Sequence, residues 1–354
     1  MAKIIETSIG ARPSYRLGEP IVITFSFKNV SENNLYILPW NTPMDDYLTD
    51  CIIVKRGKKK IPYDGILVKR GHPHQEDYLS LEAGKSVDKS FDITREFNIS
   101  ELGDYSITVD TRIADVVIND AASSKKQLLD NKTHSFKNTK IGKTTQKFEV
   151  IRGSTPRKTI AEIEREKERS IRSERLENKT IVEPPPPGFV GGNGQQQLET
   201  VEAHKKAIKS IEICLKNLDQ SPTGSPDYIV WFGKSVSIRF EKIVKHFRDI
   251  HHVQLNEEIT YNLTGNGCKP SWYAYTYKGS RTIWLCTGFW NTNNSDIFDS
   301  RYGTIIHEFS HAVCDTEDLI YSTAACELLA INDPGKAIIN ADNHEYFAET
   351  IAMK

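Results

Sequence analysis

A stretch rich in charge, proline and glycine divides the chain into two halves with different hydrophobic patterns. Residues 155–181 are dominated by Glu, Arg and Lys, Pro184–Pro187 are four consecutive prolines, and Gly191–Gly194 contains three glycines. Proline runs are extended and glycine-rich segments are flexible, so this stretch is typical of a linker and is the most exposed place for a protease to cut. A chain of 354 residues is long enough for two domains. The predicted parts are residues 1–152, a linker of residues 153–194, and residues 195–354.

Residues 1–152 carry the alternating pattern of half-buried strands. Apolar residues recur at every second position in several short runs, among them Ile21, Ile23, Phe25 and Phe27, and later Tyr105, Ile107 and Val109. Turn residues separate these runs, and about seven short strands spaced in this way indicate an all-β sandwich. The segment Leu102–Tyr105 resembles the tyrosine corner of immunoglobulin-like domains. We therefore predict an immunoglobulin-like β-sandwich for residues 1–152.

Residues 195–354 change to a helical pattern. Apolar residues fall at steps of three and four, or their sums, from Leu198 to Leu218 and again from Val236 to Ile250. Two strand-like runs follow, residues 272–277 and 282–286, with Lys278–Ser280 as a hairpin turn. We predict a mainly α-helical domain with a small antiparallel sheet. An edge strand at this hairpin is well placed to pair with an extended peptide.

The overall composition excludes several classes of partner. The formal net charge is −1, so nothing indicates binding to nucleic acid. No stretch approaches the roughly 20 apolar residues needed to span a membrane. The first residues, Met1–Glu6, lack the apolar core of a signal peptide. The hydrophobic share of 38% and the charged share of 26% are those of a globular protein.

The segment His307-Glu308-Phe309-Ser310-His311 carries the strongest chemical signal in the chain. On a helix, residues four apart share a face, so both imidazoles can bind one metal ion. Glu308 then lies beside the position where a metal-bound water would lose its proton. Apolar neighbours surround the motif, which indicates a buried helix, and buried polar side chains need partners. The motif therefore predicts the zinc site of a metallopeptidase.

A zinc site of this kind needs a third protein ligand. No histidine follows His311 at the spacing that a third imidazole would require. Carboxylates are the remaining ligands, and the residues alone leave five of them open: Asp315, Asp318, Glu327, Asp342 and Glu345.

Several separated blocks of the second half resemble the aspzincins, the deuterolysin family of metallopeptidases, and in particular their peptidyl-Lys metalloendopeptidase branch. The resemblance covers roughly residues 190–354. It rests on Gly303–His311, on Thr316–Asp318 with Tyr321, on Asn340–Phe347, and on the upstream segments Tyr273–Tyr275, Leu285–Trp290 and Asp299–Arg301.

The resemblance implies a zincin-like metalloprotease domain with one Zn²⁺ and a complete set of site residues. His307, His311 and Asp318 would bind the zinc, and Glu308 would be the general base. Tyr321 would donate a hydrogen bond to the oxyanion as it forms.

The resemblance also implies a specificity pocket and a disulfide. Asp342 and Glu345 share a helix face and would bind the compact ammonium of a lysine substrate, so that cleavage falls on the N-terminal side of lysine. Cys268 and Cys286 would form a disulfide.

The first half resembles the propeptide domain that precedes the catalytic domain in several family members. The expected protein is a secreted zymogen, with an export route left open, that acts on protein or peptide substrates. Its N-terminal domain would assist folding, inhibit the enzyme and pack on the catalytic domain. Two alternatives are a secreted toxin or effector protease whose sandwich serves adhesion or delivery, and a binding protein with an inactive protease domain.

Overall fold

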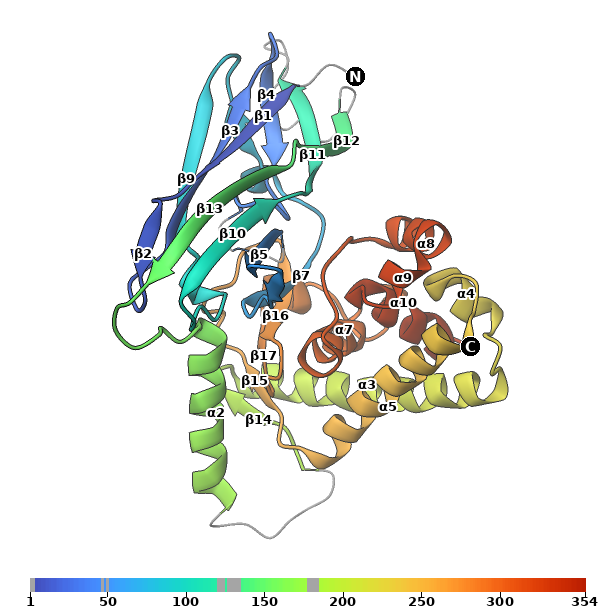
Figure 1. Ribbon diagram of the computed structural model, residues 1–354. Coiled ribbons are helices and arrows are strands. Elements are labelled where there is room, and N and C mark those ends of the chain that lie inside the picture. The colour runs from blue at the N-terminus through green and yellow to red at the C-terminus, as the bar shows by residue number, and fades with distance from the viewer. Residues whose placement is uncertain (1–3, 46–47, 49–50, 120–124, 126–134, 177–184) are drawn as a thin grey trace. The chain divides into compact units, whose positions relative to one another are not determined.

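The computed structural model describes residues 4–45, 48, 51–119, 125, 135–176 and 185–354 (Figure 1). By its internal contacts the chain divides into two units. Unit 1 comprises Met1–Ile66 and Pro73–Ile163, and unit 2 comprises Leu67–His72 and Glu164–Lys354. The short segment Leu67–His72 thus belongs by its contacts to unit 2, although the chain on both sides of it belongs to unit 1. Of the predicted linker, residues 177–184 lie outside the described residues.

Among the described residues of unit 1, antiparallel strands form three sheets, and β2 pairs with β13 in parallel. The first sheet contains β1 (Ile5–Gly10), β3 (Val22–Asn29) and β9 (Ser86–Asp92). The second contains β2 (Ser14–Arg16), β13 (Thr144–Ile151), β10 (Gly103–Val109), β5 (Ile52–Arg56) and β6 (Lys59–Ile61). The third contains β12 (Ser135–Lys140), β11 (Arg112–Asn119), β4 (Asn34–Leu38) and β8 (Leu79–Leu81). Short 3-10 turns occupy Gln75–Asp77 and Ile93–Arg95.

The alternating pattern of the sequence has the predicted effect on burial in unit 1. In β3, Ile23, Phe25 and Phe27 are fully buried, whereas Val22 is 46% exposed. The Tyr105 hydroxyl donates to the Glu101 carbonyl oxygen at 2.8 Å, which is the hydrogen bond of a tyrosine corner. The prediction of a sheet-rich first half is confirmed, and its immunoglobulin-like topology stays a prediction.

Unit 2 is mainly helical, as predicted. Its helices, together with α2 at the boundary between the units, are α2 (Ile160–Leu176), α3 (Gly194–Gln220), α4 (Pro226–Phe232), α5 (Ser237–Asn256), α6 (Thr287–Trp290), α7 (Arg301–Cys314), α8 (Thr323–Asn332), α9 (Pro334–Ala337) and α10 (Ala341–Ala352). Helix α7 packs against α3, α5 and α10, so it lies at the centre of the unit. Eleven of its residues, Tyr302–Ala312, are buried.

The sheet of unit 2 is mixed, which corrects the prediction of a small antiparallel sheet. The strand order is β14 (Gly188–Val190), β15 (Thr260–Asn262), β17 (Thr282–Leu285), β16 (Trp272–Tyr277) and β7 (Ile66–Arg70). The predicted hairpin is the antiparallel pair β16–β17, but β14–β15 and β15–β17 are parallel. Parallel neighbours need a long crossover connection, and α3, α4 and α5 supply it between β14 and β15. Strands of three residues are too short to show a period in the sequence.

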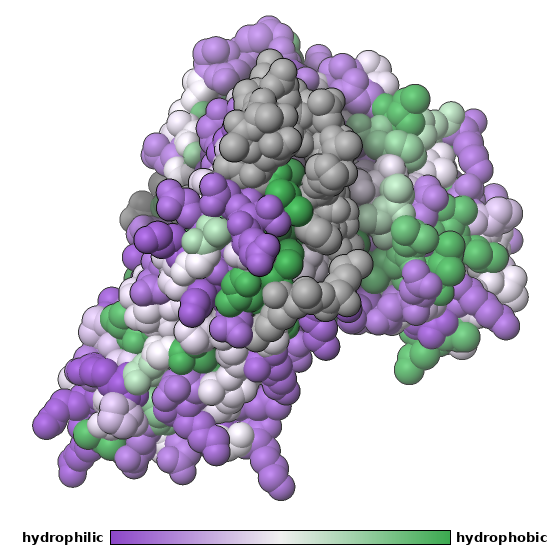
Figure 2. Space-filling view, turned by 90° about the horizontal axis from the view of Figure 1, so that it is seen from above, coloured by the Kyte–Doolittle hydropathy of each residue, from purple (hydrophilic) through white to green (hydrophobic). Residues whose placement is uncertain are grey.

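Some apolar side chains of unit 2 are exposed rather than packed into its core. In Figure 2 a hydrophobic area lies at the right, where α4 and α8 are found. The exposed residues on these helices are Ile229, Val230, Leu328 and Ile331. Among the described residues, no helix is long and apolar enough to cross a membrane.

The core of unit 2 supports a stability prediction. Phe247 on α5 is fully buried against Phe347 and His344 of α10, so Phe247→Ala leaves a cavity. We expect a loss of about 3–5 kcal/mol in the free energy of unfolding. Ile238 on the same helix is 78% exposed, and Ile238→Ala should change the free energy of unfolding by less than about 0.5 kcal/mol. Urea denaturation of both variants measures the difference, and equal losses would contradict this packing.

Candidate active site

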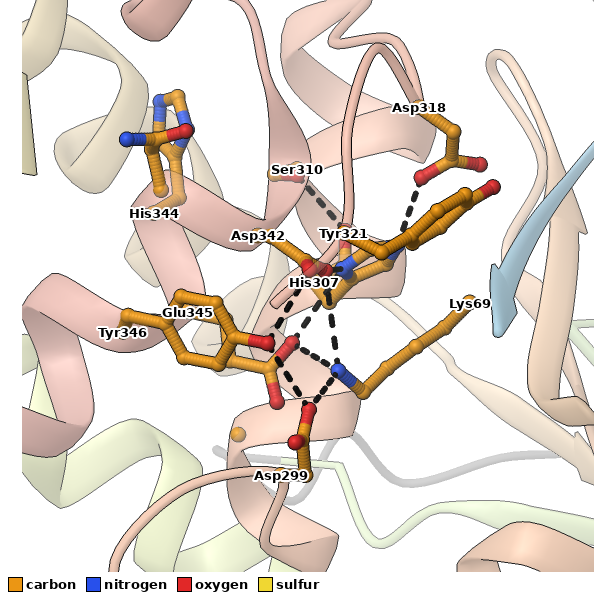
Figure 3. Close-up of polar contacts among 12 residues, drawn as sticks. Lys69, Asp299, His307, Ser310, Asp318, Tyr321, Asp342, His344, Glu345 and Tyr346 are labelled. Atoms are coloured by element: carbon orange, nitrogen blue, oxygen red, sulfur yellow. Dashed lines mark hydrogen bonds and ion pairs between the residues drawn. The ribbon is translucent and has the colours of Figure 1, made fainter. Parts of the chain in front are cut away.

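Three side chains of unit 2, those of His307, His311 and Asp318, each direct one atom toward a common point. Figure 3 shows the contact between His307 and Asp318. His307 and His311 lie one turn apart on α7, and their Nε2 atoms are 3.0 Å apart. The Oδ1 atom of Asp318 lies 3.1 Å from the first and 3.2 Å from the second. Both imidazoles are fully buried. The structure therefore brings together the two histidines of the motif and one of the five candidate carboxylates.

The chain after α7 is shaped to return Asp318 to the helix. Asp315 ends α7 in the left-handed conformation, with φ of 56°, and so acts as the helix cap. The His311 Nδ1–H donates to the Thr316 carbonyl oxygen at 2.9 Å. The Asn340 side chain accepts from the backbone N–H of Leu319, the residue next to Asp318, at 2.9 Å. Of the other candidates, Glu327 is exposed on α8.

This donor set fits a zinc ion. Ligand atoms at 2.0–2.2 Å from a tetrahedral zinc lie roughly 3.3 Å from one another, close to the spacing of these three atoms. Each imidazole directs Nε2 to the common point, while its Nδ1 is held by another group. His311 Nδ1 binds the Thr316 carbonyl, and His307 Nδ1 lies 2.9 Å from Asp342 Oδ1. Outer partners of this kind orient zinc-binding imidazoles.

The electrostatics of these groups show a site built for positive charge. Burial alone would raise the pKa of Asp318, but the charge and hydrogen bonds of His311 and His307 hold it well below its usual range. Burial alone would lower the pKa of His307, but Asp318, Asp342 and Glu345 raise it well above its usual value. Carboxylates thus surround His307 on both sides of its ring.

Glu308 is fully buried next to this point. Neither of its carboxylate oxygens makes a hydrogen bond of normal geometry within the part of the chain that the structure describes. Burial raises the pKa of Glu308 to about 8, and the charge of His307 together with the backbone N–H and ammonium of Lys69 partly offsets this effect. A buried carboxyl that no hydrogen bond of normal geometry holds is suited to act on a bound water or substrate.

Tyr321 lies on the loop after Asp318 and directs its hydroxyl to the same side. That hydroxyl donates to the backbone carbonyl oxygen of Val68 at 3.1 Å. A phenol in this position can stabilise an oxygen on which negative charge develops.

A group of acidic side chains lies on the other side of His307 from Asp318 and holds the ammonium of Lys69. Lys69 Nζ lies 2.6 Å from Glu345 Oε2 and 2.7 Å from Asp299 Oδ1, and 3.7 Å from Asp342 Oδ1. The Lys69 side chain is fully buried. The rings of Tyr273 and Tyr346 lie 5.3 and 5.7 Å from the ammonium, within the range of a cation–π contact. We call Asp299, Asp342, Glu345, Tyr273 and Tyr346 the acid pocket.

The two predicted pocket residues make different contacts. Glu345 binds the ammonium directly. Asp342 Oδ1 lies 2.9 Å from His307 Nδ1, and Asp342 Oδ2 accepts from the backbone N–H of Ser322 at 3.2 Å. Asp342 thus orients a histidine of the metal centre and contributes charge to the pocket. His307, Asp342 and Glu345 also have the spacing of a metal-binding group, but the ammonium already supplies the cation there.

Sequence reasoning missed Lys69 and the pocket roles of Asp299, Tyr273 and Tyr346. Asp299 lies one residue before Ser300, the N-cap of α7, and its left-handed backbone, with φ of 56°, gives no signal in the sequence. Lys69 ends an apolar run in the first half, far from the motif. Cys268 and Cys286 form a disulfide, with Cα atoms 5.4 Å apart.

This geometry defines a class of enzyme, the zinc metalloendopeptidases with a histidine pair on one helix and an aspartate from the following loop. Comparison with known proteins gives the family. The family model Aspzincin M35, described as a lysine-specific metallo-endopeptidase, matches residues 217–349. A peptidyl-Lys metalloendopeptidase of Pleurotus ostreatus is 33% identical over 164 residues, 46% of this chain and 95% of that protein. The chain therefore belongs to the aspzincin family and is a zinc metalloendopeptidase.

Two further similarities cover different shares of the chain. An extracellular protease of Aeromonas hydrophila is 27% identical over 335 residues, 94% of this chain and 88% of that protein, so it extends over both halves. A solved zinc peptidase from Grifola frondosa is 32% identical, covers 45% of this chain and 97% of that structure, and has a TM-score of 0.42.

The geometry predicts which carboxylate is needed for zinc. Asp318→Ala should reduce the zinc bound per chain by at least about tenfold, because a histidine pair alone completes only half of a tetrahedral site. Glu327→Ala, at an exposed candidate carboxylate, should bind zinc as the unchanged chain does. Elemental analysis after dialysis against a fixed free zinc concentration measures both. Full zinc content in Asp318→Ala would exclude Asp318 as a ligand.

Proposed function

We propose that this chain cleaves peptide bonds on the N-terminal side of lysine. The observation that carries the proposal is the acid pocket beside the metal centre, which holds a buried lysine ammonium between Glu345 and Asp299. A buried ammonium needs paired charge, and a pocket lined by carboxylates selects a cation over any neutral side chain. The description of the matching family model and the name of the Pleurotus relative support the same specificity.

Each residue of the metal centre has a role in this reaction. His307, His311 and Asp318 would hold the zinc ion, which would supply a Lewis acid for the substrate carbonyl and lower the pKa of a bound water. Glu308 takes the proton of the attacking water and returns it to the leaving amine. The Tyr321 hydroxyl donates to the carbonyl oxygen as negative charge develops on it. Asp342 holds the ring of His307 in the orientation that directs Nε2 to the metal.

The pocket accounts for a preference for lysine over arginine. Glu345 and Asp299 approach the ammonium from different elements, α10 and the segment before α7, and their oxygens converge on one nitrogen. A compact ammonium fits this convergence, whereas a planar guanidinium needs a wider, flatter set of acceptors. The rings of Tyr273 and Tyr346 lie alongside the ammonium.

We further propose that the enzyme is exported and made as a zymogen, with activation by a cut in the linker. The Cys268–Cys286 disulfide favours an oxidising compartment, and the name of the Aeromonas relative supports export. Among the alternatives, an inactive binding protein is disfavoured by a complete set of Glu308, Tyr321 and three ligand atoms. A toxin or effector protease would use the same active site, so it differs only in the role of unit 1.

Cleavage specificity follows from the acid pocket. Digestion of a denatured proteome should give new N-termini that begin with lysine. Glu345→Gln and Asp299→Asn should each lower kcat/KM for a lysine peptide by about 10- to 100-fold, the effect of losing one hydrogen-bonded charge partner. Sequencing of the new N-termini by mass spectrometry tests the first point. A broad spread of residues at those termini would exclude the pocket as the specificity site.

The role of Glu308 is tested separately from zinc binding. Glu308→Gln should lower kcat by about 10²- to 10⁴-fold, because proton transfer to and from the reacting groups is lost. Its zinc content should stay that of the unchanged chain, since Glu308 lies outside the group of three ligand atoms. Undiminished turnover of a fluorogenic lysine peptide would show that another group is the base.

A further inference from the structure

We propose that Leu67–His72 is an internal substrate segment, bound in the active site of unit 2 as a lysine peptide would be, which keeps the intact chain latent. The inference rests on the proposed lysine specificity, because it assigns Lys69 to the pocket that would select substrates. It goes further by naming the residues that block the site. It also names the peptide bond, Val68–Lys69, that occupies the position of a substrate's scissile bond.

The main chain of the segment is bound as an added strand. Strand β7 is the edge strand of the sheet of unit 2, and its neighbour is β16. Beyond β7, the Gly71 N–H donates to the Ser271 carbonyl oxygen at 2.8 Å. The Val68 N–H donates to Asp318 Oδ2 at 2.8 Å, on the oxygen that does not face the histidines. Strand addition to a sheet edge is a common way for enzymes and adaptor domains to bind extended peptides.

The side chain of Lys69 occupies the acid pocket fully. Its stem is buried and its ammonium lies between Glu345 and Asp299, as Figure 3 shows. Burial alone would lower the pKa of Lys69, but Asp299, Glu345 and Asp342 raise it well above its usual value. Glu345 and Asp342 are buried and Asp299 is partly exposed. Two buried carboxylates without a cation would be costly, so the pocket and the ammonium stabilise each other.

The peptide bond between Val68 and Lys69 faces the groups that would act on a substrate. The Val68 carbonyl oxygen accepts from the Tyr321 hydroxyl at 3.1 Å. On the other side of the bond, the backbone N–H of Lys69 interacts with the Glu308 carboxylate. The carbonyl thus faces the oxyanion donor and the amide nitrogen faces the proton carrier. This is the placement expected of a bond whose following residue is lysine.

The segment is also tethered in a way that favours occupancy. The chain continues from it into unit 1 at Ile66 and at Pro73, so it cannot diffuse away. A tethered ligand competes at a high effective concentration against any external peptide. A free substrate can bind only in the fraction of chains whose site has opened.

The test compares intact, zinc-loaded chains that differ at one lysine. We expect Lys69→Ala to cleave a peptide with one internal lysine with a kcat/KM at least about tenfold above that of the intact unchanged chain, because its site is open more often. Lys58→Ala, at an exposed lysine of unit 1, should match the unchanged chain. Mass spectrometry at the end of each assay establishes that the linker is uncut.

The outcomes separate this inference from the proposed function. If Lys69→Ala is as inactive as the unchanged chain while a cut in the linker activates both, the internal substrate segment is excluded and the zymogen stands. If the intact unchanged chain is already as active as its cut form, latency is excluded. If Lys69→Ala releases activity that is not directed to lysine, the segment is supported and the specificity is overturned.

A second measurement does not depend on turnover or on the folding of a variant. In the unchanged chain, acetylation of Lys69 by an amine-reactive reagent should be at least about 100-fold slower than that of Lys58, because a buried, charge-paired ammonium reacts only through local opening. Mass spectrometry of the labelled chain gives both rates. Equal rates at the two lysines would show that Lys69 is not in the pocket and would overturn the inference.

Discussion

The two ring nitrogens of His307 join the metal centre to the acid pocket. Its Nε2 faces His311 and Asp318, and its Nδ1 faces Asp342, which belongs to the pocket. A shift of this ring would therefore change the contacts of both groups together. Helix α7 fixes the ring because it is buried between α3, α5 and α10. The position of the pocket relative to the metal thus follows from the packing of one helix.

Buried negative charge dominates this part of the molecule and needs buried positive charge to balance it. Asp318, Asp342, Glu345 and Asp299 converge around His307 and Lys69, and zinc adds the remaining charge when bound. A further buried carboxylate, Glu349, accepts from the backbone N–H and hydroxyl of Ser300 at 2.9 and 2.6 Å. Because Ser300 follows Asp299 and caps α7, this contact fixes the pocket aspartate. The same charges that would select a lysine substrate also select the chain's own lysine.

The parts of the site that could be predicted from the sequence are those set by local spacing. His307 and His311 follow from a single helical turn, and Glu345 follows from its i, i+3 relation to Asp342 once the family resemblance is seen. Asp318 could not be chosen over Asp315 from the residues alone. The left-handed residue that ends α7 and turns the loop leaves no mark in the hydrophobic pattern of the sequence. Lys69 lies 230 residues from Asp299 and 276 from Glu345, so only the fold brings them together. The strands β14 and β15 have only three residues each, too few to show a period in the sequence. Without them the predicted sheet contained only the antiparallel hairpin.

The central claim is that one buried site holds zinc on one side of His307 and the ammonium of Lys69 on the other. Diffraction from crystals of the intact, zinc-loaded chain, recorded at the zinc absorption edge, tests it most directly. We expect an anomalous peak about 2.0–2.2 Å from His307 Nε2, His311 Nε2 and an oxygen of Asp318. We also expect electron density for the Lys69 side chain between Asp299 and Glu345. A zinc peak among His307, Asp342 and Glu345, with Lys69 outside the pocket, would contradict the central claim.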